Sequence, residues 1–196
     1  GACSNERLRA GVRSRGVEVE LFTRPFEEVS FNVGATFADT RYRQNLVGSG
    51  GRPLTPALFQ LPDRRLSNSS KLSLTTALGF TPRIGGSGLR GLFYVDARHA
   101  TRFNTGSDLD IEKIQKAYTV VNGRIGIQGP DQLWAVELWA QNLFKEDYLQ
   151  VAFDATLQGS GTRRAVVNGF APSSNQLFGA FLAEPQTYGL TLRTGF

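Results

Sequence analysis

Several segments of this chain alternate between apolar and polar residues with a period of two. Successive side chains of a β-strand point to opposite faces, so this pattern predicts strands with one apolar and one polar face. The predicted strands are residues 17–24, 29–37, 71–80, 89–98, 121–128, 134–141 and 187–196. The last segment alternates most clearly. Tyr, two Leu and the final Phe fall on one face, and Thr, Gly and Arg fall on the other.

The connections between these strands alternate in length. Short turns follow the first, third and fifth strands, at residues 25–28, 82–87 and 129–132. Long polar loops follow the second, fourth and sixth strands, at about residues 43–68, 102–116 and 144–186, and residues 110–116 are predicted to include a short helical turn. Transmembrane β-barrels have this asymmetry, with short periplasmic turns and long extracellular loops.

Composition narrows the fold class. Hydrophobic residues make up 40% of the 196 residues, and the mean hydropathy is −0.22. The sequence holds no apolar run of the roughly 18 to 20 residues that a transmembrane helix needs, whereas a barrel strand needs only about 10 alternating residues. We therefore predict an all-β, antiparallel transmembrane β-barrel whose Val, Leu and Phe faces are covered by hydrocarbon chains.

Three stretches resemble a known family: RSRGVEVEL at residues 13–21, NLFKEDY at 142–148 and FLAEPQTYGLTLRTGF at 181–196. Together they resemble the C-terminal part of a TonB-dependent outer-membrane receptor. The resemblance implies that residues 1–196 supply about seven C-terminal strands of a 22-stranded barrel, with the plug domain and the earlier strands outside this chain. It further implies active uptake of a scarce nutrient (a siderophore, vitamin or glycan) across the outer membrane of a Gram-negative bacterium, and no enzymatic activity.

The resemblance also implies partners. These are outer-membrane lipid and lipopolysaccharide, the plug and N-terminal strands of the receptor, TonB acting through the plug, and the barrel-assembly machinery. The chain has no Met and no signal peptide, so we expect a trimmed protein or a piece of a longer one. The net charge of +5 is spread along the sequence without a basic stripe, which does not favour nucleic-acid binding.

Two other function classes stay open on the residues alone. A small self-contained outer-membrane barrel or porin would require extra strands concealed near residues 151–170. A soluble secreted β-sandwich binding module has the same strand alternation, because its apolar faces pack against a second sheet.

Candidate functional residues fall into three groups. By resemblance to outer-membrane barrels, the terminal strand recognised during assembly carries Tyr188, Leu190, Leu192 and Phe196. Charged residues on the polar parity should face the lumen and pair with other strands or with the plug: Glu18, Glu20, Arg98, Arg124, Glu137 and Arg193. Candidate ligand contacts in the long loops are Arg41, Tyr42, Phe59, Phe103 and Phe153, although loop aromatics can equally pack against neighbouring loops.

The sequence offers little metal or catalytic chemistry, and no cofactor is expected. His99 is the only histidine, which excludes a multi-histidine metal site, and Cys3 is the only cysteine, which excludes an internal disulfide. Asp108, Asp110 and Glu112 recur at every second residue, as calcium ligands can, but the Gly of an EF-type loop is missing. We expect these carboxylates to belong to a hydrated loop.

Overall fold

A computed structural model describes residues 11–52, 54, 58–157, 159 and 161–195. The predicted all-β, antiparallel fold is confirmed, and each segment expected to be a strand is one. In chain order the long strands are β1 (Val12–Phe26), β2 (Val29–Tyr42), β3 (Leu72–Phe80), β5 (Leu89–Ala100), β8 (Tyr118–Gln128), β9 (Trp134–Gln141) and β12 (Thr187–Thr194). They pair in the order β1-β2-β3-β5-β8-β9-β12, and the short β4 (Arg83–Ile84) pairs with β5.

The long loops contain structure that the alternation did not predict. β6 (Phe103–Asn104) pairs with β7 (Ile114–Gln115), and β10 (Leu149–Asp154) pairs with β11 (Phe178–Leu182). A short helix, α1 (Arg163–Val167), lies between β10 and β11. The helical turn predicted over residues 110–116 is corrected: only Ile111–Lys113 forms a 3₁₀ turn, and the chain then enters β7.

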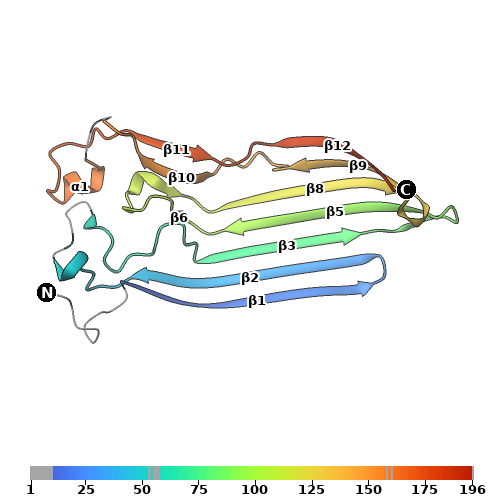
Figure 1. The fold of residues 1–196 in the computed structure, drawn as a ribbon, viewed down its shortest axis with the longest axis horizontal. Coiled ribbons are helices and arrows are strands. Elements are labelled where there is room, and N and C mark those ends of the chain that lie inside the picture. Colours follow the sequence, from blue (N-terminus) through green and yellow to red (C-terminus); the bar gives the residue numbers. More distant parts are fainter. Residues whose placement is uncertain (1–10, 53, 55–57, 158, 160, 196) are drawn as a thin grey trace.

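The long strands lie side by side in one layer (Figure 1). The short turns gather at one end of this sheet and the long loops at the other, with the β10–β11 hairpin extending beyond β9 and β12. Within the described residues β10 and β11 pair only with each other, so the extra strands do not close the sheet. None of the helices in this part of the chain has the length and apolarity to span a membrane.

The apolar face of the sheet is not covered by protein in the described residues. Leu21, Ile125, Leu138 and Leu190 come from four different strands, and each is at least half exposed. The described residues therefore supply no second sheet, which a β-sandwich requires. Buried apolar residues lie mainly in and near the loops instead: Leu61, Ala100, Leu109, Tyr118, Ala135 and Ala152.

The strand register places polar residues from different strands in rows. Tyr94 is opposite Arg124, Arg124 is opposite Trp139, and Trp139 is opposite Gly189. A Cβ atom on Gly189 would lie 2.5 Å from the Trp139 ring, so a glycine is required where this indole crosses β12. The ring is held by a hydrogen bond from its Nε1 to Thr191 Oγ1, 3.1 Å long.

Candidate functional site

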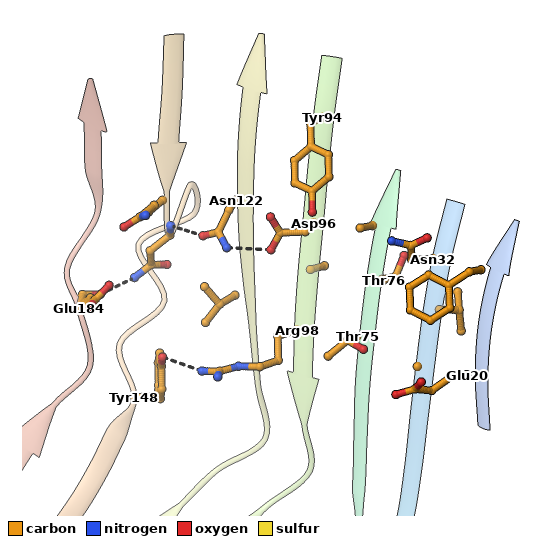
Figure 2. Close-up of a pocket in the computed structure, with 18 of the residues that line it drawn as sticks. Glu20, Asn32, Thr75, Thr76, Tyr94, Asp96, Arg98, Asn122, Tyr148 and Glu184 are labelled. Atoms are coloured by element: carbon orange, nitrogen blue, oxygen red, sulfur yellow. Dashed lines mark hydrogen bonds between the residues drawn. The ribbon is translucent and has the colours of Figure 1, made fainter. Parts of the chain in front are cut away.

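A polar hollow of about 610 Å³ lies on the polar face of the sheet, toward the loop end. Figure 2 shows side chains from β1, β2, β3, β5 and β8 pointing into it, together with residues of the segments that follow β9 and precede β12. Its polar lining includes Glu20, Asn32, Thr75, Asp96, Arg98, Asn122 and Tyr148. Amide, carboxylate, guanidinium and phenol groups therefore converge on one surface.

A chain of hydrogen bonds crosses the floor of this hollow. Asn122 donates from Nδ2 to Asp96 Oδ2 over 2.8 Å, and its Oδ1 accepts from the backbone N–H of Asn142 over 2.9 Å (Figure 2). The three residues come from β5, β8 and the turn after β9. This part of the floor is pre-organised, because the partners hold each amide in one orientation.

Asn142 connects two of the three sequence stretches that resemble the receptor family. It is 4% exposed and has a positive φ of 49°, a conformation that Asn tolerates better than most residues. Its Oδ1 accepts from the backbone N–H of Glu146, and its Nδ2 donates to the carbonyls of Glu146 and Glu184. Gln186 Nε2 adds a 2.9 Å bond to the Leu143 carbonyl. The Asn-Leu-Phe segment is thus tied to the chain that leads into β12.

Aromatic rings flank the hollow at its loop end. Arg98 donates from Nη2 to the Tyr148 hydroxyl over 2.9 Å. Tyr148 stacks on Tyr118 with ring centroids 4.1 Å apart and an interplanar angle of 11°, and Phe103 meets Tyr118 edge-on at 6.3 Å. A guanidinium beside a flat aromatic wall suits planar or anionic groups.

The six charged residues predicted to face the lumen share the polar face of the sheet. Glu137 is 4% exposed and lies between two arginines, with Arg193 Nε at 3.1 Å and Arg124 Nη1 at 3.9 Å. Arg124 also covers the Tyr94 ring at 4.4 Å. Glu20 and Arg98 line the hollow, whereas Glu18 lies outside it and accepts a 3.4 Å bond from Thr36. A second hollow holds the Arg124–Glu137–Arg193 group.

A buried ionic cluster joins three of the loops. Lys113 is 2% exposed, and its ammonium donates to Asp108, lies 2.6 Å from Asp154 and 3.5 Å from Asp110. Gln60, from the loop between β2 and β3, donates to Asp110. Lys113 also lies over the Phe178 ring of β11, 5.5 Å from its centre. These contacts hold together loops that are distant in sequence. We call the group the Lys113 cluster; it comprises Gln60, Asp108, Asp110, Lys113 and Asp154.

Burial and the neighbouring charges shift the pKa values of two members of the Lys113 cluster, Lys113 and Asp110. Burial alone would lower the pKa of Lys113, but its hydrogen bonds to Asp108 and Asp154 raise that pKa above the usual value. Burial, and then the neighbouring carboxylate of Asp108, raises the pKa of Asp110 to about 6. Three carboxylates share one ammonium, so negative charge is in excess at neutral pH.

Only two of the three carboxylates that the sequence spacing suggested lie together, and the expectation of a hydrated loop is wrong for Asp110, which is 4% exposed. Asp108, Asp110 and Asp154 offer oxygens within 4.8 Å of one another, while Glu112 instead accepts a bond from the Arg163 backbone N–H. The Lys113 ammonium lies among the three aspartates. A lysine of the chain thus supplies the positive charge that a calcium ion would supply.

The candidate ligand-contact residues are not gathered in one place. Phe59 packs on Phe170 at 4.5 Å and Phe153 packs against Phe181 at 5.5 Å, so both contribute to loop packing. Arg41 and Phe103 line a third hollow, of about 610 Å³, between the loops. The backbone N–H of Tyr42 bonds to the Arg64 carbonyl.

The remaining candidates have simpler surroundings. His99 bonds through Nδ1 to Thr119 on the neighbouring strand, on the apolar face. Tyr188, Leu190 and Leu192 project from the apolar face of β12 and are 58% to 80% exposed. Phe196 and Cys3 lie outside the described residues. Sequence reasoning missed Tyr148, Asn122 and Lys113, because their roles depend on partners from distant segments.

The sequence matches the family model for the β-barrel of TonB dependent receptor-like proteins over residues 3–143. The chain belongs to the TonB-dependent receptor β-barrel family. This family is a class of transport receptors and not a class of enzymes. No curated protein matches the chain.

Solved structures share the fold. The ferric yersiniabactin uptake receptor FyuA from Yersinia pestis superposes with a TM-score of 0.66 at 14% identity, over 94% of this chain and 24% of that receptor. The siderophore receptor PiuA from Acinetobacter baumannii gives 0.63 at 12% identity, over 92% and 21%. The ferric preacinetobactin receptor BauA from the same species gives 0.60 at 15% identity, over 92% and 22%. The chain thus spans about a quarter or less of each receptor, and its open sheet is part of a barrel.

Proposed function

We propose that this chain is the C-terminal part of a TonB-dependent receptor that takes up a ferric siderophore across the outer membrane of a Gram-negative bacterium. The observation that carries the proposal is the membership of the receptor-barrel family, combined with a one-layer sheet whose apolar face is exposed and whose opposite face is a polar hollow. The three structures compared above are named as a ferric yersiniabactin uptake receptor, a siderophore receptor and a ferric preacinetobactin receptor, which supports this proposal. In this proposal the plug, the earlier strands and TonB are partners supplied outside the chain.

Uptake of radiolabelled iron tests this proposal. Deleting the gene of the complete receptor in iron-starved cells should abolish uptake of at least one ferric siderophore from a chemically diverse panel. Complementation should restore it, and loss of TonB should abolish it again. Uptake that continues without TonB would indicate a porin-like channel, and unchanged uptake of every siderophore would point to a vitamin or glycan as the nutrient.

We also propose that β12 and the residues after it are the strand that the barrel-assembly machinery recognises. The support is a strand of apolar–polar alternation in which Tyr188, Leu190 and Leu192 project together from one face. Deleting Phe196 from the complete receptor should lower the amount of heat-modifiable, folded barrel on gels. An unchanged folded band would contradict this role.

A further inference from the structure

The third hollow, between the loops, is lined by an excess of cations. Its volume is about 610 Å³, and among the described residues its lining holds one carboxylate, that of Asp63, and five guanidinium groups. The five are those of Arg41, Arg64, Arg65, Arg102 and Arg164. We call this site the arginine hollow. It is distinct from the polar hollow on the sheet, since the described lining residues of the two do not overlap.

The arginines reach the hollow from four segments that backbone contacts hold together. Arg41, at the end of β2, forms an isolated antiparallel bridge with Arg65. The backbone N–H of Asn68 donates to the Asn104 carbonyl over 2.8 Å, which joins the loop after β2 to the loop after β5. α1 is joined to this second loop as well, because its first backbone N–H donates to Glu112 over 3.1 Å. The fold itself therefore brings these like charges together.

Two of the five arginines already have an anionic partner. Asp39 lies 2.8 Å from Arg41 Nε and 3.2 Å from Arg65 Nη2. Arg65 is further fixed by a 2.7 Å bond from Nη1 to the Ala38 carbonyl, and its side chain is 19% exposed. These two side chains therefore form a rigid, partly neutralised wall of the hollow.

The other three guanidinium groups have no such partner. Within the described part of the chain, no carboxylate lies at ion-pair distance from Arg64, Arg102 or Arg164. Arginines on the sheet differ, since Arg83 and Arg193 each pair with a glutamate, at 2.8 Å and 3.1 Å. A cleft lined by charge of one sign concentrates ligands of the opposite sign. The hollow is therefore suited to an anion.

The rest of the lining indicates what kind of anion fits. Phe103, Leu109 and Ile111 line the same hollow, and the Phe103 ring is oriented by its edge-on contact with Tyr118. Guanidinium groups bind pairs of anionic oxygens through parallel hydrogen bonds, and an aromatic wall suits a flat ring. The volume lies within the range of about 300–1,000 Å³ typical of small-molecule sites. The lining thus fits a compact, oxygen-rich anion with an apolar part.

We propose that the arginine hollow binds a ferric chelate of net negative charge, whose outer oxygens contact Arg64, Arg102 and Arg164. This inference rests on the proposed function and names the charge class of the siderophore. Ferric catecholate and hydroxycarboxylate chelates are anions, whereas a ferric tris-hydroxamate is neutral. A neutral chelate would leave the three guanidinium groups facing one another without compensation, so the hollow discriminates between chelates by charge.

Titration of the complete receptor, purified in detergent, tests the charge class. The probes are a ferric tris-catecholate and a ferric hydroxycarboxylate chelate, both anionic, and a neutral ferric tris-hydroxamate, with binding followed by quenching of tryptophan fluorescence. One of the anionic chelates should bind at least about tenfold more tightly than the neutral chelate, the effect of a single hydrogen bond to a charged group. Added salt should weaken the binding of that anion only, because exposed charges are screened.

Neighbouring arginines of α1 provide a matched pair of variants. R164Q should weaken binding of the anionic chelate by about tenfold, and R102Q by a similar factor. Arg163 is exposed and does not line the hollow, so R163Q should bind as wild type does. Arg102 and Arg164 form no ion pair in the described residues, so the variants should keep the heat-modifiable folded band. The salt dependence of wild type needs no variant at all.

The outcomes separate this inference from the function on which it rests. Equal effects of R163Q and R164Q, or neutral-chelate binding as tight as that of both anions, would overturn the charge assignment while leaving siderophore uptake intact. Complete displacement of the chelate by millimolar inorganic phosphate would also overturn it, because the hollow would then be a general anion site. Binding of none of the ferric chelates would instead refute the proposed function.

Discussion

Glu137 is the carboxylate on which the charges of the polar face converge. It is almost fully buried, whereas Arg124 and Arg193, its two partners, keep 41% and 61% of their side-chain exposure. The guanidinium groups can still be solvated, but the carboxylate depends on them. At the scale of single residues, the polar face is therefore held together by a buried anion between two half-exposed cations.

Replacing Glu137 by Gln should destabilise the barrel. The change removes the anion while leaving the two arginines facing each other, and losing charged hydrogen bonds of this kind costs about 1–3 kcal/mol. Urea unfolding of the complete receptor in detergent measures the loss. Glu18→Gln is the matched control, because Glu18 is exposed and its hydrogen bond from Thr36 is long, at 3.4 Å; equal effects of the two changes would contradict the role given to Glu137.

At the scale of elements, the Lys113 cluster joins three of the loops. Its members come from the loop after β2, the loop after β5 and the β10–β11 hairpin. An ammonium that is almost completely buried needs these carboxylates, and the carboxylates need it. Breaking the cluster should therefore affect all three loops together.

Lys113→Met should increase hydrogen exchange at residues 58–63, 108–113 and 149–154 at once. The methionine keeps most of the side-chain volume but leaves three carboxylates without their cation. Hydrogen–deuterium exchange of the complete receptor, followed by mass spectrometry, gives the readout. Lys116→Met, an exposed neighbour, should change little. Faster exchange confined to residues 108–113 would show that the loops are not coupled.

The same cluster should depend on pH through Asp110. Its pKa of about 6 lies above the ordinary value of 3.8, so the folded loops bind this proton more tightly than unfolded loops do. The resulting stabilisation is complete below about pH 4 and is lost as the pH rises through 6. After correction for intrinsic exchange rates, loop protection should be severalfold greater at pH 5 than at pH 7.5. Asp110→Asn should remove this difference, and a pH dependence that persists in the variant would contradict the assignment.

At the scale of the whole molecule, the sheet is a single layer with one apolar face and one polar face. This arrangement is stable only if lipid covers the first and protein or water covers the second. The backbone groups on the free edges of β1 and β12 pair with no strand in the described residues. The chain is thus built to be completed by further strands.

Leu21→Arg should block assembly of the receptor, whereas Glu20→Arg on the neighbouring position should be tolerated. Leu21 projects from the middle of the apolar stripe of β1 and Glu20 into the polar hollow. An arginine at the membrane midplane costs about 2–4 kcal/mol. The folded fraction in the outer membrane, read from heat-modifiable gels, compares the two. Equal assembly of both variants would contradict the lipid-facing side.

The alternation of apolar and polar residues was sufficient to predict the long strands, their faces and the single-layer sheet. β10 shows the same alternation, with Leu149, Val151 and Phe153 on one face. Because it is only six residues long, the alternation is too short to distinguish it from a loop. The Lys113 cluster could not be predicted, because Gln60 and Asp154 come from segments that are distant in sequence from Asp108, Asp110 and Lys113. A lysine in a polar segment is usually solvated, and only the tertiary arrangement shows that this one is buried.

The joining of three loops at the Lys113 cluster has an evolutionary consequence. Loops that moved independently could each diversify toward a new nutrient by its own substitutions. Here a change near residue 60, 110 or 154 alters the surroundings of the other two, so the effects of substitutions should be non-additive across loops. New nutrient specificities would then require compensating substitutions in several loops. Related receptors should therefore show covariation between these positions.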